Sequence, residues 1–216
     1  AILSRGLGDV YKRQLKTLSS VQCIGLEAAV QMVGFYERAG FQKDCITTRR
    51  QMLFRSEASL DASPSQRSDV AVVPLREVSL EAIQRYDERH EISPRPHFLE
   101  LWLRHRAGDV FAARDAEGEC HGYVRIRPCL LPIGEGWRVG PWLAEDPGMA
   151  SLLLNNALDH HNGVVLIDTP GHNPSAKTIL SARGFKPMTS TVRMYKGVIP
   201  RGHDRNVYGL ACLELG

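Results

Sequence analysis

The strongest constraint on the fold is an internal repeat of strand, helix, Gly-Phe corner and strand. One copy covers residues 164–197, and a weaker copy covers residues 21–52. Such a repeat predicts two related modules in one chain. When the copies are aligned on their Gly-Phe corners, a threonine follows each phenylalanine by six residues and an arginine follows by eight. The matched residues are Gly40, Phe41, Thr47 and Arg49 in the first copy and Gly184, Phe185, Thr191 and Arg193 in the second.

The composition is typical of a globular protein, with 43% hydrophobic and 24% charged residues. No apolar run reaches the roughly eighteen residues that a membrane-spanning helix needs. Five cysteines without C-x-x-C spacing favour a reducing compartment, so we expect a cytoplasmic protein. The net charge of +3 falls within residues 1–69, which leaves residues 70–216 neutral. We therefore expect no nucleic-acid partner and no membrane partner.

The chain divides into four parts. Residues 1–14, AILSRGLGDVYKRQ, resemble a translated sequencing adapter, and we interpret them as an artefactual leader rather than a genuine basic one. Residues 15–55 carry the weaker copy and are interpreted as the C-terminal remnant of a first domain. Residues 56–69 have the Ser, Asp and Ala content of a linker, and residues 70–216 form the second domain. A one-helix remnant cannot bury much core, so it should dock on the rest or pair with another chain, which makes a homodimer a candidate.

Local patterns in residues 70–216 predict a strand, two helices, three strands, a helix, a strand, a helix and two strands. Ser79, Asp146 and Asn173 are placed to cap the helices that follow them. Hairpins come early in this order and crossovers come late. The pattern therefore predicts an α+β fold with a mixed, mostly antiparallel sheet and helices on both faces. The last strand is expected over Val207–Leu215, and the helix of the weaker copy over Val30–Ala39.

This order, together with the sequence around the helix-Gly-Phe corner, resembles the GCN5-related N-acetyltransferase (GNAT) family. Residues 26–41, with Leu-Glu-Ala-Ala and then Phe-Tyr-Glu-Arg-Ala-Gly-Phe, are similar to the late strand-helix-strand piece of that family. Residues 173–185 are similar to its N-x-x-A-x-x-x-Y-x-x-x-G-F motif, with leucine in place of the tyrosine. Residues 70–216 also resemble the C-terminal domain of tandem YitH-type acetyltransferases.

The resemblance implies acyl transfer from acetyl-CoA to the amino group of a small molecule. It implies that Tyr36 is the proton donor, whereas Leu180 holds that position in the second copy and can donate nothing. Asp168 is a candidate base at a strand end, with a loop-capping carboxylate as the alternative. Tyr36, Tyr123 and Trp142 have core packing as their alternative, and Asp87 and Arg95 have surface roles as theirs. The resemblance gives coenzyme contacts at Val139, Gly140 and Asn173, and a substrate pocket at Asp87, Arg95, Tyr123 and Trp142.

The stretch expected to hold the coenzyme phosphates departs from the family pattern. Glu145 and Asp146 would repel phosphates, and Pro147 lacks an N–H group. Arg193 is expected to meet a phosphate or to pair with Asp168 or a helix end. The corresponding loop of the first module is expected before residue 15.

Two functional hypotheses follow. In the first, the parent protein acetylates an amine, with the first module supplying most of the coenzyme site. In the second, residues 70–216 are a catalytically silent binding or dimerisation module, which Leu180 and the acidic loop favour. No H-x-x-x-H or H-E-x-x-H spacing occurs, so we predict no metal site.

Overall fold

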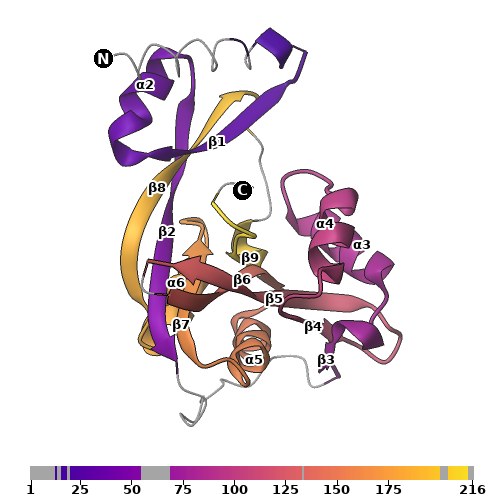
Figure 1. Cartoon of the computed structure of the whole chain (residues 1–216). Helices are drawn as coiled ribbons and strands as arrows, with labels where there is room; N and C mark the ends of the chain where they lie inside the picture. Colours follow the sequence, from indigo (N-terminus) through magenta and orange to yellow (C-terminus); the bar gives the residue numbers. More distant parts are fainter. Residues whose placement is uncertain are drawn as a thin grey trace.

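The structure, a computed structural model, describes residues 13, 16–18, 20–54, 69–132, 134–199 and 204–213 (Figure 1). Its strands are β1 (Cys23–Ala29), β2 (Gln42–Phe54), β3 (Ala71–Pro74), β4 (Asp109–Arg114), β5 (Cys120–Leu131), β6 (Gly134–Ala144), β7 (Gly163–Thr169), β8 (Lys186–Gly197) and β9 (Val207–Gly209). They form one sheet in the order β1-β8-β2-β7-β6-β5-β4-β3, and β9 pairs with β6 outside this row. Only the pairing of β6 with β7 is parallel in the described sheet, which confirms the predicted mixed, mostly antiparallel arrangement.

The predicted helix caps are confirmed. The side chains of Ser79, Asp146 and Asn173 each accept a hydrogen bond from the backbone N–H three residues later, at 2.8–3.0 Å. The helix expected over Val30–Ala39 is shorter, because a 3₁₀ turn at Val30–Met32 comes first. The helices are α2 (Val33–Arg38), α3 (Leu80–His90), α4 (Pro96–Arg104), α5 (Pro147–Leu158) and α6 (Pro174–Ala182). The predicted leader and linker lie outside the described residues, except for Arg13 and Asp69.

Helices cover both faces of the sheet, as the sequence predicts. Figure 1 shows α5 on one side of β5 and β6, with α3 and α4 on the other. Successive strand residues alternate between these faces. Tyr123 and Leu143 pack in the core with α3 and α4, whereas Val124 and Trp142 pack in the core with α5 and α6. A third, smaller cluster joins α2 to the outer end of the sheet.

The two repeat copies exchange strands rather than folding side by side. β2 of the first copy lies between β7 and β8 of the second, and β8 lies between β1 and β2. Thr47 and Thr191, the threonines at matched repeat positions, face each other directly in the β2–β8 ladder. The first copy thus docks within the chain and completes the sheet of the second copy.

The exchange also decides which charged residues pair. Asp168 on β7 receives two hydrogen bonds from Arg49 on β2, at 2.7 and 2.9 Å. Glu27 on β1 receives one from Arg193 on β8 at 2.7 Å, and its oxygens also accept from Thr47 and Thr191. The expected pairing of Arg193 with Asp168 is therefore wrong, because each arginine meets the carboxylate of the other copy's strand.

β9 fills the space where β6 and β7 diverge. β6 pairs with β7 only over Trp137–Val139, and it pairs with β9 at Trp142 and Leu143. The backbone N–H of Leu210 then donates to the carbonyl oxygen of Asp168 on β7, at 2.9 Å. The final strand covers Val207–Gly209, and residues 210–213 of the predicted Val207–Leu215 are not in a strand, while residues 214–215 lie outside the described residues.

The ion pair between Arg49 and Asp168 gives a test of the exchanged strands. The substitution Arg49→Met leaves Asp168, which is only 1% exposed, as a buried charge without its cation. We expect it to lower the free energy of unfolding by about 3 kcal/mol, measured by urea denaturation. The control is Arg85→Met, since Arg85 and its partner Glu119 are about half exposed and their loss should cost less than about 1 kcal/mol. Equal losses for the two variants would contradict the pairing.

Candidate functional site

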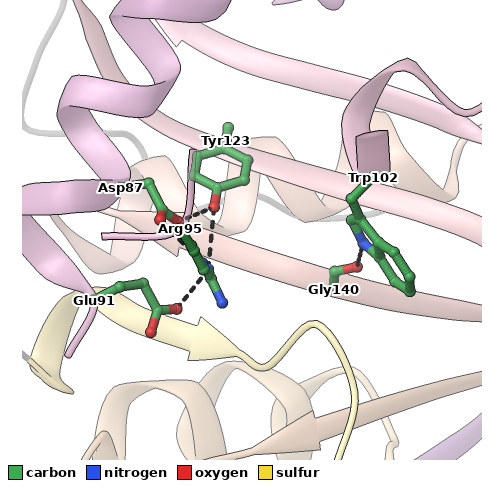
Figure 2. A network of polar contacts seen from close by, with 6 residues as sticks. All are labelled: Asp87, Glu91, Arg95, Trp102, Tyr123 and Gly140. Atoms are coloured by element: carbon green, nitrogen blue, oxygen red, sulfur yellow. Dashed lines mark hydrogen bonds and ion pairs between the residues drawn. The ribbon is translucent and has the colours of Figure 1, made fainter. Parts of the chain in front are cut away.

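A buried polar network joins α3, the start of α4 and β5 (Figure 2). Arg95 donates to both oxygens of Asp87, at 3.0 and 2.7 Å, and to Glu91 at 2.7 Å. The hydroxyl of Tyr123 donates a short hydrogen bond to Asp87. The structure therefore brings together Asp87, Arg95 and Tyr123, three of the four residues that the sequence assigned to a substrate pocket.

One cation serves two carboxylates in this network. Burial opposes the charge of Arg95, but Tyr123, Glu91 and Asp87 outweigh that effect and raise its pKa, so Arg95 stays protonated. Burial, followed by the nearby Asp87, raises the pKa of Tyr123, which therefore keeps its proton. Burial also raises the pKa of Glu91 to about 7, an effect that Arg95 opposes and Asp87 reinforces. Glu91 can thus exchange a proton near neutral pH.

Glu91 lines a small cavity that both repeat copies help to form. Its volume is about 40 Å³, which gives room for a water molecule or the head of an amine. β2 of the first copy lines one part, and β8 and the segment around β9 line others. The lining residues are Asp44, Cys45, Thr47, Glu91, Ile92, Pro170, His172, Arg193, Tyr195, Val207 and Leu210.

Glu91 was not predicted from the sequence as a functional residue. In the sequence it is one of several acidic residues at the end of a helix, without a recognisable motif. Its burial depends on segments far away in the chain, including Val207 and Leu210, which line the same cavity. The nearest local signal in the sequence is the separation of four residues between Glu91 and Arg95. This spacing predicts an ion pair, but it does not predict the pKa of Glu91.

Trp142 and Asn173 lie elsewhere. Trp142 is fully buried on the opposite face of the sheet, where its indole N–H donates to Ala150. The side-chain oxygen of Asn173 caps α6, and its amide donates to the carbonyl oxygens of Arg205 and Val207, at 2.8 and 3.0 Å. The hydrogen bonds of both side chains thus stabilise the fold.

The two residues considered for catalysis also lie apart from the network. Both oxygens of Asp168 accept hydrogen bonds from Arg49, so the carboxylate is engaged in an ion pair between β7 and β2. Tyr36 belongs to α2 and packs edge-on against the rings of Phe35 and Phe41 in the small outer cluster.

Coenzyme A does not fit between β6 and β7 as the chain is folded. β9 occupies that space, and a Cβ atom added at Gly140 would clash with the carbonyl oxygen of Leu210. At the start of α5, Asp146 already accepts the N–H of Met149, and Pro147 has no N–H to offer a phosphate. Of the two strand residues assigned to the coenzyme, Gly140 therefore packs against Leu210 of the C-terminal segment, and Val139 pairs with Ile167 of β7.

One group of side chains has the composition of a metal site. Asp44, Cys45 and His172 each bring a ligand atom within 4.8 Å of the others. Asp44 is already hydrogen-bonded to His172, at 2.9 Å, and burial raises the pKa of the Cys45 thiol to about 11. In the described part of the chain, no helix is long and apolar enough to cross a membrane.

Known proteins share this architecture. The chain is 25% identical over 195 residues to a holothin acyltransferase from Pseudoalteromonas sp. (strain SANK 73390), a match that covers 89% of this chain and 62% of the relative. A putative acetyltransferase from Pyrococcus horikoshii superposes with a TM-score of 0.72 at 21% identity, over 95% of this chain and 64% of that one. A GCN5-related N-acetyltransferase from Sphaerobacter thermophilus gives a TM-score of 0.59 at 13% identity, over 91% and 69%.

The chain thus spans less than two thirds of the curated relative and of the Pyrococcus horikoshii protein. Residues 83–209, more than half of the chain, match the sequence profile of the acetyltransferase (GNAT) domain. This match includes the network of Asp87, Glu91, Arg95 and Tyr123 as well as β9. The chain belongs to the GNAT acetyltransferase family.

Proposed function

We propose that the parent protein transfers an acetyl group from acetyl-CoA to the amino group of a small molecule or peptide. Enzymes of the GNAT family generally use acyl-CoA and act on amines of this kind. The observation that carries the proposal is the position of Glu91, a largely buried carboxylate that lines a cavity formed by both repeat copies. Burial there raises the pKa of Glu91 to about 7. In this proposal the first domain holds the coenzyme, and Glu91 acts on the acceptor.

The role proposed for Glu91 is that of general base. An amine attacks a thioester only as the neutral species, and most alkyl amines carry a proton at neutral pH. A carboxylate with a pKa near 7 can take that proton and still be ionised in a large fraction of molecules. Arg95 is shared between Asp87 and Glu91, and Arg193, which also acts on Glu91, is paired with Glu27. The negative charge that remains attracts an ammonium group.

The remaining sequence hypotheses are part of this proposal. Tyr36 is proposed as the proton donor to the departing thiolate in the first domain, since Leu180 is fully buried and apolar.

The five cysteines are all free, which supports the cytoplasmic location. β1 and β3 are the outer strands of the described sheet, and a strand of a second copy would pair there in a homodimer.

The base role is tested by Glu91→Gln in the full-length parent protein. We expect kcat/KM to fall by about a hundredfold or more, because glutamine keeps the size of the side chain but accepts no proton. In the unchanged protein kcat/KM should rise with pH through about 7, as Glu91 loses its proton, and this limb should vanish in the variant. Glu88→Gln on the exposed face of α3 is the control and should leave the profile unchanged. An unaltered profile in Glu91→Gln would remove Glu91 from the mechanism.

A second candidate function is a catalytically silent GNAT module. The specific observation in its favour is β9, which pairs with β6 in the space expected for the coenzyme. In that case residues 70–216 would complete and brace the sheet of the first domain through the exchanged strands. Wild-type activity in Glu91→Gln would favour this candidate over the first.

Titration with acetyl-CoA tests whether the space between β6 and β7 is closed. We expect no heat of binding when millimolar acetyl-CoA is added to the 216-residue chain, since β9 and the capped start of α5 leave it no site. The full-length parent should bind acetyl-CoA under the same conditions if the first domain holds it. Binding by the 216-residue chain, with shifts in the backbone amide signals of Val207–Gly209, would contradict the closed arrangement.

A further inference from the structure

A second cavity lies between α4 and the C-terminal half of β5, apart from the network around Glu91. Its volume is about 500 Å³, within the range of small-molecule sites. Its walls are mainly apolar and carry positive but no negative side chains. The lining residues are Phe98, Leu101, Trp102, His105, Ala107, Arg125, Arg127 and Pro128.

Arg125 is a buried cation that no carboxylate of the described residues neutralises. The residue is 2% exposed, and its Nη2 group donates to the backbone carbonyls of Ala107 and His105, at 2.8 and 3.5 Å. Its Nε atom is buried and has no hydrogen-bond partner in the described structure. A buried charge in this condition is costly unless something supplies the missing partner.

A second arginine reinforces the positive charge. Arg127 lies two residues along β5, on the same face of the strand, and both guanidinium groups lie near the ring of Trp102, at 5.2 and 4.9 Å. Burial and the nearby Arg127 lower the pKa of Arg125 to about 10. The ring of Trp102 offsets part of this charge, and an anion would offset more.

His105 adds a donor at the rim. The N–H of Ala107 donates to its Nδ1 atom at 3.2 Å, so the neutral ring carries its proton on Nε2. The indole N–H of Trp102 donates to the carbonyl oxygen of Gly140, at 3.4 Å (Figure 2). This bond helps to hold the ring near which Arg125 and Arg127 lie. The cavity thus combines a fixed aromatic wall with donors for an acidic group.

We propose that this cavity binds a small organic carboxylate. Arg125 and Arg127 hold the carboxylate, and the apolar part of the ligand lies against Phe98, Trp102 and Pro128. A carboxylate suits the site better than a phosphate, because a more strongly hydrated anion would lose its water against mostly apolar walls. The proposal concerns binding alone and does not depend on acyl transfer.

Calorimetry with two matched probes tests the proposal on the 216-residue chain. Phenylacetate supplies a carboxylate and a ring, and phenylacetamide has nearly the same shape without the charge. We expect phenylacetate to bind at millimolar concentration or below and phenylacetamide to bind at least about tenfold more weakly. Equal affinities, or no binding of phenylacetate, would overturn the proposal. Displacement of phenylacetate by an equal concentration of inorganic phosphate would overturn the choice of carboxylate.

Two leucines provide matched variants that should not disturb folding. Leu101 is 76% exposed at the cavity, and Leu130 is 86% exposed outside its lining. Leu101→Glu adds a negative charge beside the arginines and should weaken phenylacetate binding at least about tenfold, whereas Leu130→Glu should leave it unchanged. Arg125→Met should abolish binding in a protein whose near-ultraviolet circular dichroism is unchanged. Wild-type affinity in Leu101→Glu would show that phenylacetate binds elsewhere and would overturn the assignment.

Discussion

The insertion of β2 between β7 and β8 is the interaction on which the rest of the structure depends. It joins two strands that would otherwise have unpaired edges inside the sheet, and it brings Arg49 to Asp168. The same exchange encloses Glu27 between Arg193 and two threonines. Buried carboxylates of this kind are tolerated only with close partners, so the ion pairs hold the two copies in one register.

The cavity beside Glu91 is a consequence of this exchange. β2 brings residues of the first copy to it, and the segment around β9 closes its other side. Water is thereby largely excluded from Glu91, and the resulting loss of solvation raises its pKa more than Arg95 lowers it. The proton affinity of this one carboxylate therefore depends on segments from both repeat copies.

Local features were predictable from the sequence, and long-range pairings were not. The caps at Ser79, Asp146 and Asn173 follow from residue type and position, and the structure confirms each of them. The repeat predicted related modules, but a repeat contains no information about which copy pairs with which. The sequence therefore offered a phosphate, Asp168 or a helix end as the partner of Arg193, whereas the exchange gives it Glu27.

In the candidate site, too, some residues were predictable from the sequence and others were not. The resemblance directed attention to Asp87, Arg95 and Tyr123, which lie together. It could not reveal Glu91, whose pKa comes from burial by distant residues. Nor could it reveal that β9 takes the space between β6 and β7, since that depends on the route of the chain after Asn206.

The buried arginines of the described chain differ in a way that bears on ligand binding. Arg49, Arg95 and Arg193 each contact a carboxylate directly, and the pKa values of Arg95 and Arg193 are raised as a result. Arg125 is buried at least as deeply, yet it has only backbone carbonyls, a tryptophan ring and a second arginine. Arg50, which is 7% exposed, likewise has a buried Nε atom without a hydrogen-bond partner in the described structure, but it is Arg125 that lines the cavity. The open cavity beside Arg125 is where an anion from solution would supply the missing charge.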